Sequence, residues 1–283
     1  FILDPSEIMF NLYVNFSWIQ YFMKIIVCLK QVLDTAAPIT IENNQVVSPG
    51  SSRIINPYDE FGIEEAVRIK EIKPDSEITL LTLGPEVFKD SIKRALAMGA
   101  DMGVHLCDPK FEGLDSYAVA RILKSYIDTI PYDLIFCGRQ AVDVDRAQTG
   151  PALATLLSIP FVTVVTGVEF SDDFLKAKIT RQVEGGSEIR EQALPLLLTC
   201  QKGLNEPRLP SLKGIMAAKK KEILTLSCSD LNLDEGDLAL DNNRVVEVKL
   251  SLPPERKKGI ILEGDENDVS VSLVQSLRKE KII

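Results

Sequence analysis

The chain of 283 residues contains one histidine and five cysteines, and the cysteines stand at least 28 residues apart. It has no CxxC pair and no cysteine–histidine pair, so it offers few of the residues that a zinc site or a histidine-based catalytic dyad needs. Three of the cysteines lie in apolar, strand-like runs, where a free cysteine behaves as a small hydrophobic side chain. We therefore expect no metal centre, and a reducing, cytoplasmic compartment.

Common catalytic and nucleotide motifs are also missing. The sequence has no GxGxxG after its first strand-like run, no GxxxxGK[ST] and no GxSxG elbow. His105 lies inside the strand-like run Val104–Leu106 and is expected to be structural. Asp143 and Asp145 stand two residues apart in a predicted loop, a common arrangement that is weak evidence for acid–base chemistry. We assign no catalytic residue and expect a binder of a nucleotide-shaped ligand.

No segment reaches the roughly 20 predominantly apolar residues of a membrane-spanning helix. The net charge of −9, from 41 acidic and 32 basic residues, argues against a nucleic-acid surface as the main function. With 45% hydrophobic and 26% charged residues, the chain is expected to bury a substantial core.

The first 22 residues differ in composition from the rest, because seven of the aromatic side chains lie there. This stretch lacks the basic start and the unbroken apolar run of a secretory signal. Met23 stands directly before a strand-like run. We interpret residues 1–22 as an extension produced by an upstream start, with Met23 the native start, and a genuine interaction tail is the alternative.

From residue 24 to about 165, short apolar runs alternate with segments of helical spacing, which predicts a doubly wound, mostly parallel α/β sheet. Helices are expected from Pro57 with Asn56 as cap, over 86–98 and 116–128, and after Pro151. The predicted strands are Ile25–Leu29, Ile78–Leu83, Val104–Cys107, Leu134–Cys137 and Val162–Val165.

After residue 166 the apolar pattern changes to period two, which predicts an antiparallel extension of Val168–Phe170, Phe174–Val183 and Ser187–Ala193. A further strand-like run, Leu196–Cys200, precedes residues 202–222, which carry six basic and two acidic side chains. We expect an α/β domain over 23–228, then a region over 229–283. That region comprises an acidic linker (229–241) and a C-terminal arm with a helix over 268–281.

In an open α/β sheet, ligands collect beyond the carboxyl ends of the strands. The segment Gly138–Gly150 follows a predicted strand, contains two glycines and two arginines, and leads into a helix. Close backbone approach, a helix N-terminus and arginine side chains favour binding of phosphate. A solvated loop whose arginines pair with Asp143 and Asp145 is the alternative.

Five motifs in register resemble the small (beta) subunit of the electron-transfer flavoprotein family over about residues 23–283. They are Met23–Val32, Asn56–Arg68, Leu83–Pro85, Gly138–Gly150 and Asn205–Lys221. Residues 1–22 have no counterpart in the family pattern.

This resemblance implies an adenine-nucleotide alpha-hydrolase-like fold and a heterodimer with an alpha subunit that carries a redox FAD. The beta subunit would hold AMP in ordinary members and a second FAD in electron-bifurcating members. Arg139, Gln140 and Thr149 would face phosphate, and backbone groups near Cys28 and Leu83 would read adenine. The implied nucleotide contacts are Cys28, Asn56, Pro57, Tyr58, Asp59, Leu83, Gly138, Arg139, Gln140, Ala141, Val142, Asp143, Val144, Asp145, Arg146, Ala147, Gln148 and Thr149.

The basic residues 205–221 correspond to the family's recognition loop, which docks a partner dehydrogenase. Leu212 would be the apolar anchor, and Lys219, Lys220 and Lys221 would form an electrostatic rim. A lysine-rich, exposed helix end is the alternative interpretation.

The segments Lys30–Thr35 and Asn56–Asp59 resemble the electron-bifurcating members. Leu33, however, stands where the family usually has proline, and Val144 stands where bifurcating members more often have glycine. The bifurcating interpretation implies NADH as donor, with ferredoxin or flavodoxin and an acyl-CoA dehydrogenase or quinone oxidoreductase as acceptors. The alternatives are a conventional carrier with AMP and a stand-alone adenine-nucleotide sensor. An ATP-pyrophosphatase-type enzyme is disfavoured, because Lys30-Gln31-Val32 is not the Ser-Gly-Gly-like loop that it needs.

Overall fold

The computed structural model describes residues 22–233, 242–254 and 259–283. The predicted extension 1–22, except Phe22, and residues 234–241 of the predicted acidic linker therefore lie outside the described residues. Two compact units are present. One holds the chain up to Ile39 together with Ser48–Val248, and the other holds Thr40–Val47 and Lys249–Ile283.

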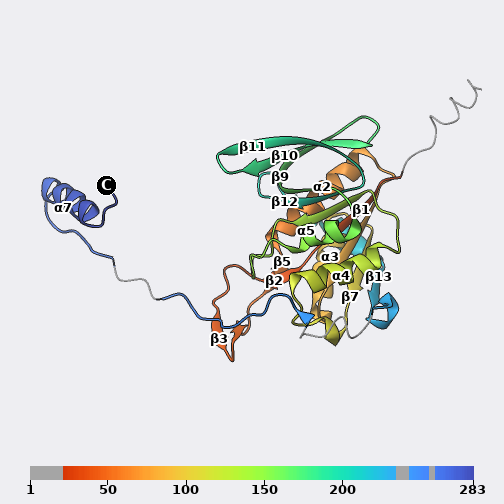
Figure 1. Cartoon of the computed structure of the whole chain (residues 1–283), viewed down its shortest axis with the longest axis horizontal. Helices are drawn as coiled ribbons and strands as arrows, with labels where there is room; N and C mark the ends of the chain where they lie inside the picture. The colour runs from red at the N-terminus through yellow and green to blue at the C-terminus, as the bar shows by residue number, and fades with distance from the viewer. Residues whose placement is uncertain (1–21, 234–241, 255–258) are drawn as a thin grey trace, which may run out of the picture. The chain divides into compact units, whose positions relative to one another are not determined.

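The larger unit is built on one nine-stranded sheet, seen in Figure 1. From β9 to β13 every neighbouring pair is parallel, and β10 and β11 extend the sheet as an antiparallel hairpin, which confirms the predicted fold class. In spatial order the strands are β11 (Gly186–Ala193), β10 (Lys176–Val183), β9 (Phe161–Phe170), β12 (Leu196–Cys200), β8 (Leu134–Gly138), β1 (Lys24–Cys28), β6 (Glu77–Leu83), β7 (Met102–Leu106) and β13 (Ile223–Leu226).

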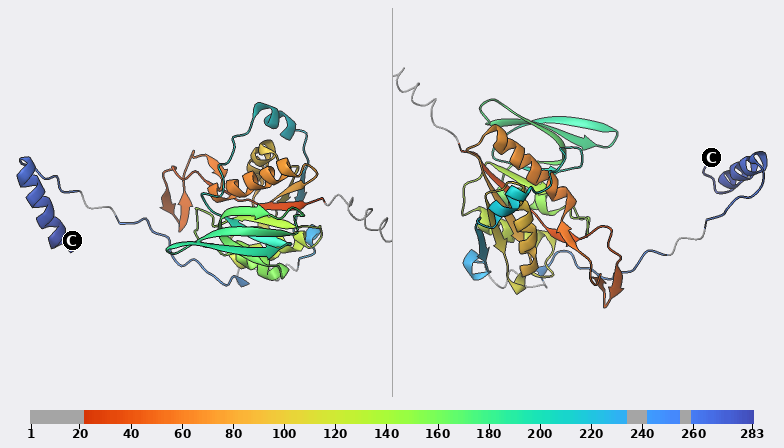
Figure 2. Two further views of the ribbon diagram at one scale, coloured as in Figure 1. Left: turned by 90° about the horizontal axis from the view of Figure 1, so that it is seen from above. Right: turned by 180° about the vertical axis from the view of Figure 1, so that it is seen from behind.

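Helices cover both faces of this sheet, as the two views of Figure 2 show. On one face lie α2 (Pro57–Ile72) and α3 (Lys89–Met98), the latter preceded by the 3-10 turn η1 (Glu86–Phe88). On the other face lie α4 (Ser116–Ile127) and α5 (Thr149–Leu157). Because side chains alternate along a strand, Val27 and Phe136 enter the first core, and Ile26 and Ile135 enter the second.

The order of the parallel strands reverses between β1 and β8, since β6 and β7 extend the sheet on one side and β8 and β12 on the other. A crevice at the carboxyl ends of the strands is expected at such a reversal. The topology therefore directs attention to the ends of β1 and β8.

Several elements differ from the sequence prediction. The runs around Val162 and Val168 form one strand, β9, which pairs parallel with β12 at its start and antiparallel with β10 at its end. β13 was not predicted, because a strand of only four residues shortly after a basic run gives almost no periodic signal. The short ribbon of β2 (Gln31–Leu33) and β5 (Arg53–Ile55) was also missed.

The larger unit continues past the predicted boundary at residue 228. Leu231, in the 3-10 turn η3 (Ser229–Leu231), is buried in the second core. Asp115, the N-cap of α4, accepts hydrogen bonds from the backbone N–H of Arg244 (2.6 Å) and of Val245 (3.2 Å). The Arg244 guanidinium lies 3.5 Å from the centre of the Tyr117 ring. These contacts hold residues 244 and 245 on the α/β fold.

The smaller unit consists of the hairpin β3 (Thr40–Glu42) and β4 (Gln45–Val47) together with the C-terminal residues. The Leu250 N–H donates to Asn44 Oδ1 over 2.6 Å. The predicted C-terminal helix is α7, which spans Glu266–Lys279 and is capped by Asp265. Across both units, none of the helices in the described ranges combines the length and apolarity that crossing a membrane requires.

Candidate nucleotide site and docking segment

A cavity of about 460 Å³ opens at the carboxyl ends of the central strands. Its wall includes the ends of β1, β6 and β8, the loop that follows β8, and the start of α4. The volume lies within the roughly 300–1,000 Å³ that small-molecule and cofactor sites occupy. The predicted crevice at the strand reversal is therefore present, with walls contributed by both halves of the sheet.

Asp59, in the first turn of α2, lies at the base of this cavity and is buried. Its carboxylate accepts hydrogen bonds from the Lys30 N–H (2.7 Å), from Asn56 Nδ2 (2.8 Å) and from the backbone of Gly138. One carboxylate thus joins the end of β1, the start of α2 and the end of β8. Burial raises the pKa of Asp59 to about 7, against the opposing effect of these donors.

Asn56 is the N-cap residue of α2, as predicted, but its buried side chain makes no capping hydrogen bond to the helix backbone. Its Nδ2 donates to Asp59 and to the Gln140 carbonyl (2.9 Å), and its Oδ1 accepts from the Val142 N–H (3.1 Å). The amide therefore holds the loop after β8 against α2, a use that a local capping pattern cannot reveal.

The loop 138–149 approaches its neighbours closely at its first residue. A Cβ on Gly138 would lie 2.1 Å from Asp59 Oδ1 and 2.9 Å from Tyr58 Cβ, so only glycine fits there. Further along, Asp145 and Ala147 have positive φ angles of 49° and 52°. The loop then leads directly into α5, whose N-terminal N–H groups favour an anion.

The side chains of this loop do not pair as in the solvated-loop alternative. Asp143 forms an ion pair with Lys30 (2.6 Å), and Asp145 accepts from Gln140 Nε2 (2.6 Å). Arg139 donates to Gln201 Oε1 at 3.4 Å, a long contact. Neither arginine of the loop is thus occupied by the loop's own carboxylates, which is the arrangement that a phosphate site needs.

Most of the eighteen implied nucleotide contacts line the cavity, and they come from four separate segments of the chain. Cys28, Asn56, Asp59, Leu83 and the larger part of the loop belong to its wall. The residues that do not line it are Pro57, Tyr58, Val142, Asp143 and Asp145.

Sequence reasoning missed the side of the cavity formed by the segment before α4. Phe111, Gly113 and Leu114 line it, together with Ser116 and Val119 of α4. The Asp115 side chain caps α4 by accepting from the N–H groups of Tyr117 and Ala118. That cap was a readable helix-start signal, but it did not show that the helix begins beside the cavity.

His105 lies in β7, within the run that was predicted to be a strand. It is fully buried, its Nε2 contacts the Gly84 carbonyl at 2.9 Å, and burial lowers its pKa. Glu86, His105 and Cys107 form a group with metal-ligand atoms within 4.8 Å of one another. Glu86 is, however, ion-paired with Lys89 at 2.6 Å, which brings a cation to that group.

We call residues 205–221 the docking segment. It contains the short helix α6 (Leu212–Ala218), capped by Ser211, and packs on α3 where Gly214 lies against the Ala97 carbonyl. Leu212 is 83% exposed, Leu209 82% and Met216 70%. Neighbouring apolar side chains exposed to this extent are typical of an interaction site.

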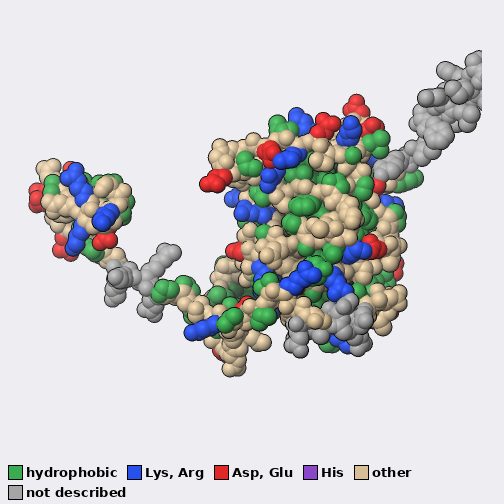
Figure 3. All heavy atoms as spheres, viewed as in Figure 1, with side chains coloured by type: hydrophobic (Ala, Val, Ile, Leu, Met, Phe, Trp, Pro, Cys, Tyr) green, Lys and Arg blue, Asp and Glu red, His purple; other side chains and the backbone are tan. Residues whose placement is uncertain are grey.

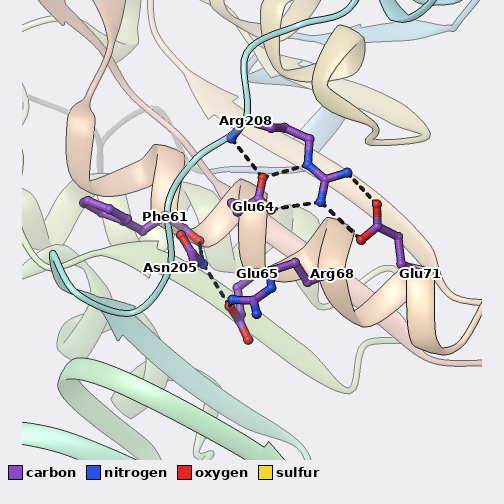
Figure 4. A network of polar contacts seen from close by, with 7 residues as sticks. All are labelled: Phe61, Glu64, Glu65, Arg68, Glu71, Asn205 and Arg208. Carbon is purple, nitrogen blue, oxygen red and sulfur yellow. Dashed lines mark hydrogen bonds and ion pairs between the residues drawn. The ribbon is translucent and has the colours of Figure 1, made fainter.

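The root of the docking segment is fixed to α2 by a network of ion pairs and hydrogen bonds (Figure 4). Arg208 binds Glu64 through Nε and Nη2, both at 2.8 Å, and also contacts Glu71. Asn205 Nδ2 donates to the Phe61 carbonyl (3.0 Å) and to Glu65 (2.8 Å). Glu64 is almost fully buried, so its carboxylate depends on Arg208 for compensation.

Lys219 and Lys220 are exposed, as a docking rim requires, but Lys221 is placed differently. Its ammonium group donates to the carbonyls of Leu96 (3.1 Å) and Ala100, at the end of α3. Burial lowers the pKa of Lys221. Figure 3 shows acidic and basic side chains interspersed on the visible face of the larger unit.

A doubly wound sheet with a cavity at its strand reversal and a glycine-bounded loop before a helix is the arrangement in which open α/β proteins bind their ligands. The family model described as electron transfer flavoprotein domain matches residues 45–231. The chain is 41% identical to the electron transfer flavoprotein subunit beta of Thermoanaerobacterium thermosaccharolyticum, over 92% of this chain and 100% of that protein.

Two further relatives extend the comparison. The electron transfer flavoprotein subunit beta of Bacillus subtilis is 39% identical, over 91% of this chain and 98% of its own length. The caffeyl-CoA reductase-Etf complex subunit CarD of Acetobacterium woodii is 36% identical, over 92% and 100%. The chain belongs to the electron transfer flavoprotein family, as a beta subunit, and beta subunits of this family pair with an alpha subunit.

Replacing Gly138 by alanine tests the close packing of Gly138 against Asp59. The added Cβ collides with Asp59, so Gly138→Ala is expected to lower the free energy of unfolding by about 1–3 kcal/mol and to weaken AMP binding. Urea unfolding and equilibrium dialysis measure the two effects. The control is Gly186→Ala, whose Cβ meets open space. Equal AMP affinity in both variants would contradict the predicted role of the loop.

Asp59 predicts a pH dependence of stability. Its folded pKa of about 7 lies above the unfolded value of about 3.9, so between these values only the folded state keeps the proton. Stability therefore falls as pH rises. From about pH 5 to about pH 8 the wild type should lose roughly 2–3 kcal/mol more than the neutral Asp59→Asn variant, measured by urea unfolding. Parallel pH profiles would disprove this.

Removing Arg208 tests the anchor of the docking segment. Arg208→Met leaves the buried Glu64 carboxylate without its cation and is expected to cost about 3 kcal/mol of unfolding free energy. Arg68→Met, which removes an exposed arginine 3.7 Å from Glu65, should cost at most about 1 kcal/mol. Equal losses of unfolding free energy in the two variants, measured by chemical denaturation, would contradict the role of Arg208 in compensating Glu64.

Proposed function

We propose that this chain is the FAD-binding beta subunit of an electron-bifurcating electron transfer flavoprotein. The observation that carries the proposal is the junction of the two segments that resemble bifurcating members, 30–35 and 56–59. The Lys30 N–H donates to Asp59 at 2.7 Å, and the β2–β5 ribbon pairs Gln31 with Ile55 just before the second segment. Lys30 from the first segment and Asn56 and Asp59 from the second line the cavity.

The residues around the cavity fit the adenosine-diphosphate half of such a cofactor. Gly138 lets the start of the loop pack closely against Asp59 and Tyr58. The loop offers two arginines and leads into the N-terminus of α5, which favours an anion. Arg139, Gln140 and Thr149 would bind phosphate oxygens, and backbone groups near Cys28 and Leu83 would bind adenine. Asn56 and Asp59 would act indirectly, because they hold the loop in place.

When bound, FAD supplies the electron-transfer chemistry, with NADH as donor, ferredoxin or flavodoxin as one acceptor, and an acyl-CoA dehydrogenase or quinone oxidoreductase as the other. The chain itself contributes binding, orientation and exclusion of water and acts as part of an electron carrier. Its docking segment would contact the dehydrogenase through Leu212, with Lys219 and Lys220 steering the encounter. A cytoplasmic location remains a prediction.

A conventional carrier with AMP in this cavity is the second candidate. Val144, which stands where bifurcating members more often have glycine, lines the cavity, and its side chain takes up space that glycine would leave open. A stand-alone sensor is disfavoured, because it needs no docking segment.

A cofactor count on the heterodimer with its alpha partner tests the proposal. Two FAD per heterodimer, with NADH-dependent ferredoxin reduction only when the high-potential acceptor is present, are expected. One FAD and one AMP per heterodimer would establish the conventional carrier instead.

Replacing Leu212 by alanine tests the docking segment in the same heterodimer. Leu212→Ala removes an exposed apolar anchor and is expected to slow electron transfer to the dehydrogenase by about tenfold or more, with cofactor content unchanged. The control is Ile72→Ala, which removes an apolar side chain of similar exposure, 73%, from the end of α2. Loss of cofactor, or equal rates in both variants, would refute the docking role.

A further inference from the structure

Two cysteines meet at the strand reversal. β1 and β8 are parallel neighbours in the register Ile26 with Ile135 and Val27 with Phe136, and the next step of this register pairs Cys28 with Cys137. Since side chains alternate, both thiols lie on the face of Ile26 and Ile135, and both belong to the core on that face. Strands about 4.8 Å apart fall within the roughly 4.4–6.8 Å between Cα atoms that a disulfide spans.

The two cysteines are close enough to influence each other, and both line the cavity. Interaction with the Cys28 side chain, ahead of burial, raises the pKa of Cys137. Both residues line the cavity, where Cys28 is half-buried and Cys137 is buried. Cys200, on the next strand, belongs to the core on the opposite face and cannot join the pair.

We propose that Cys28 and Cys137 form a redox-active dithiol in the wall of the cavity, which small-molecule disulfides oxidise reversibly when no nucleotide is bound. The Cys28 thiolate attacks one sulfur of the small disulfide, which forms a mixed disulfide and releases one thiol. The Cys137 thiol then loses its proton and attacks the Cys28 sulfur, which forms the Cys28–Cys137 bond and releases the second thiol. Two protein thiols are oxidised, and the small disulfide is reduced to two thiols.

The new bond would join the last residue of β1 to the penultimate residue of β8, directly beside the nucleotide loop. Because both cysteines line the cavity, a nucleotide bound there would cover them and block the attack on the small disulfide. This protection rests on the proposed function, whereas formation of the bond rests only on the positions of the two cysteines. The thiolate is the attacking form, and the pKa of Cys137 is raised, so little of its thiolate is present at neutral pH. The closing step is therefore expected to become faster as pH rises.

The test uses the full chain in complex with its alpha partner, freed of nucleotide and reduced. Incubation with oxidised glutathione, alkylation and non-reducing peptide mass spectrometry should detect a Cys28–Cys137 cross-link that dithiothreitol reverses. AMP at a hundred times its Kd should slow the cross-link about a hundredfold. Raising the pH should speed its closure.

Three variants give the controls. Cys137→Ser should stop at a glutathione adduct on Cys28. Cys107→Ser, which removes the other half-buried cysteine, should cross-link like the wild type. Cys200→Ser should do the same. A wild-type complex that carries glutathione on Cys28 but never forms the Cys28–Cys137 bond would overturn the dithiol. Cross-linking at the same rate with and without AMP would leave the dithiol standing and count against the nucleotide site.

Discussion

The compensation of buried carboxylates on α2 is the constraint on which the rest of the structure depends. A carboxylate removed from water needs hydrogen-bond donors or a cation, and α2 buries Asp59 in its first turn and Glu64 near its middle. Asp59 takes its donors from Lys30, Asn56 and Gly138, and Glu64 takes its cation from Arg208. The N-terminal turn of α2 thus holds part of the cavity wall, and the middle of the same helix holds the start of the docking segment.

The loop after β8 and the docking segment are held in different ways. The loop after β8 is held by backbone and amide contacts to Asn56 and by the close approach of Gly138, so its path leaves little freedom. The docking segment is held at Asn205 and Arg208 and again at Lys221. Leu209, Leu212 and Met216, between these anchors, remain exposed. Such an arrangement would suit the proposed function, in which the chain retains a nucleotide and meets partners transiently.

Much of this was predictable from local pattern. The alternation of apolar runs and helical spacing identified the parallel sheet, and the change to period two identified the hairpin β10–β11. The pattern failed where tertiary pairing overrides it. β9 changes partner within one strand, β13 pairs with β7 at the edge of the sheet, and the Asn56 side chain binds a distant loop instead of the backbone of its own helix. Long-range hydrogen bonds leave no local signature.

The sequence by itself determined the class of fold, the family resemblance and the segments that carry the site, because these depend on periodicity and on motifs that lie within short stretches. Only the tertiary structure decided which residues meet. It brought Asp59 under Gly138, placed Cys28 beside Cys137, gave Glu64 to Arg208 and directed Lys221 toward α3 instead of solvent. The physical reason is that burial and strand register, which set these contacts, arise from packing between segments that lie far apart along the chain.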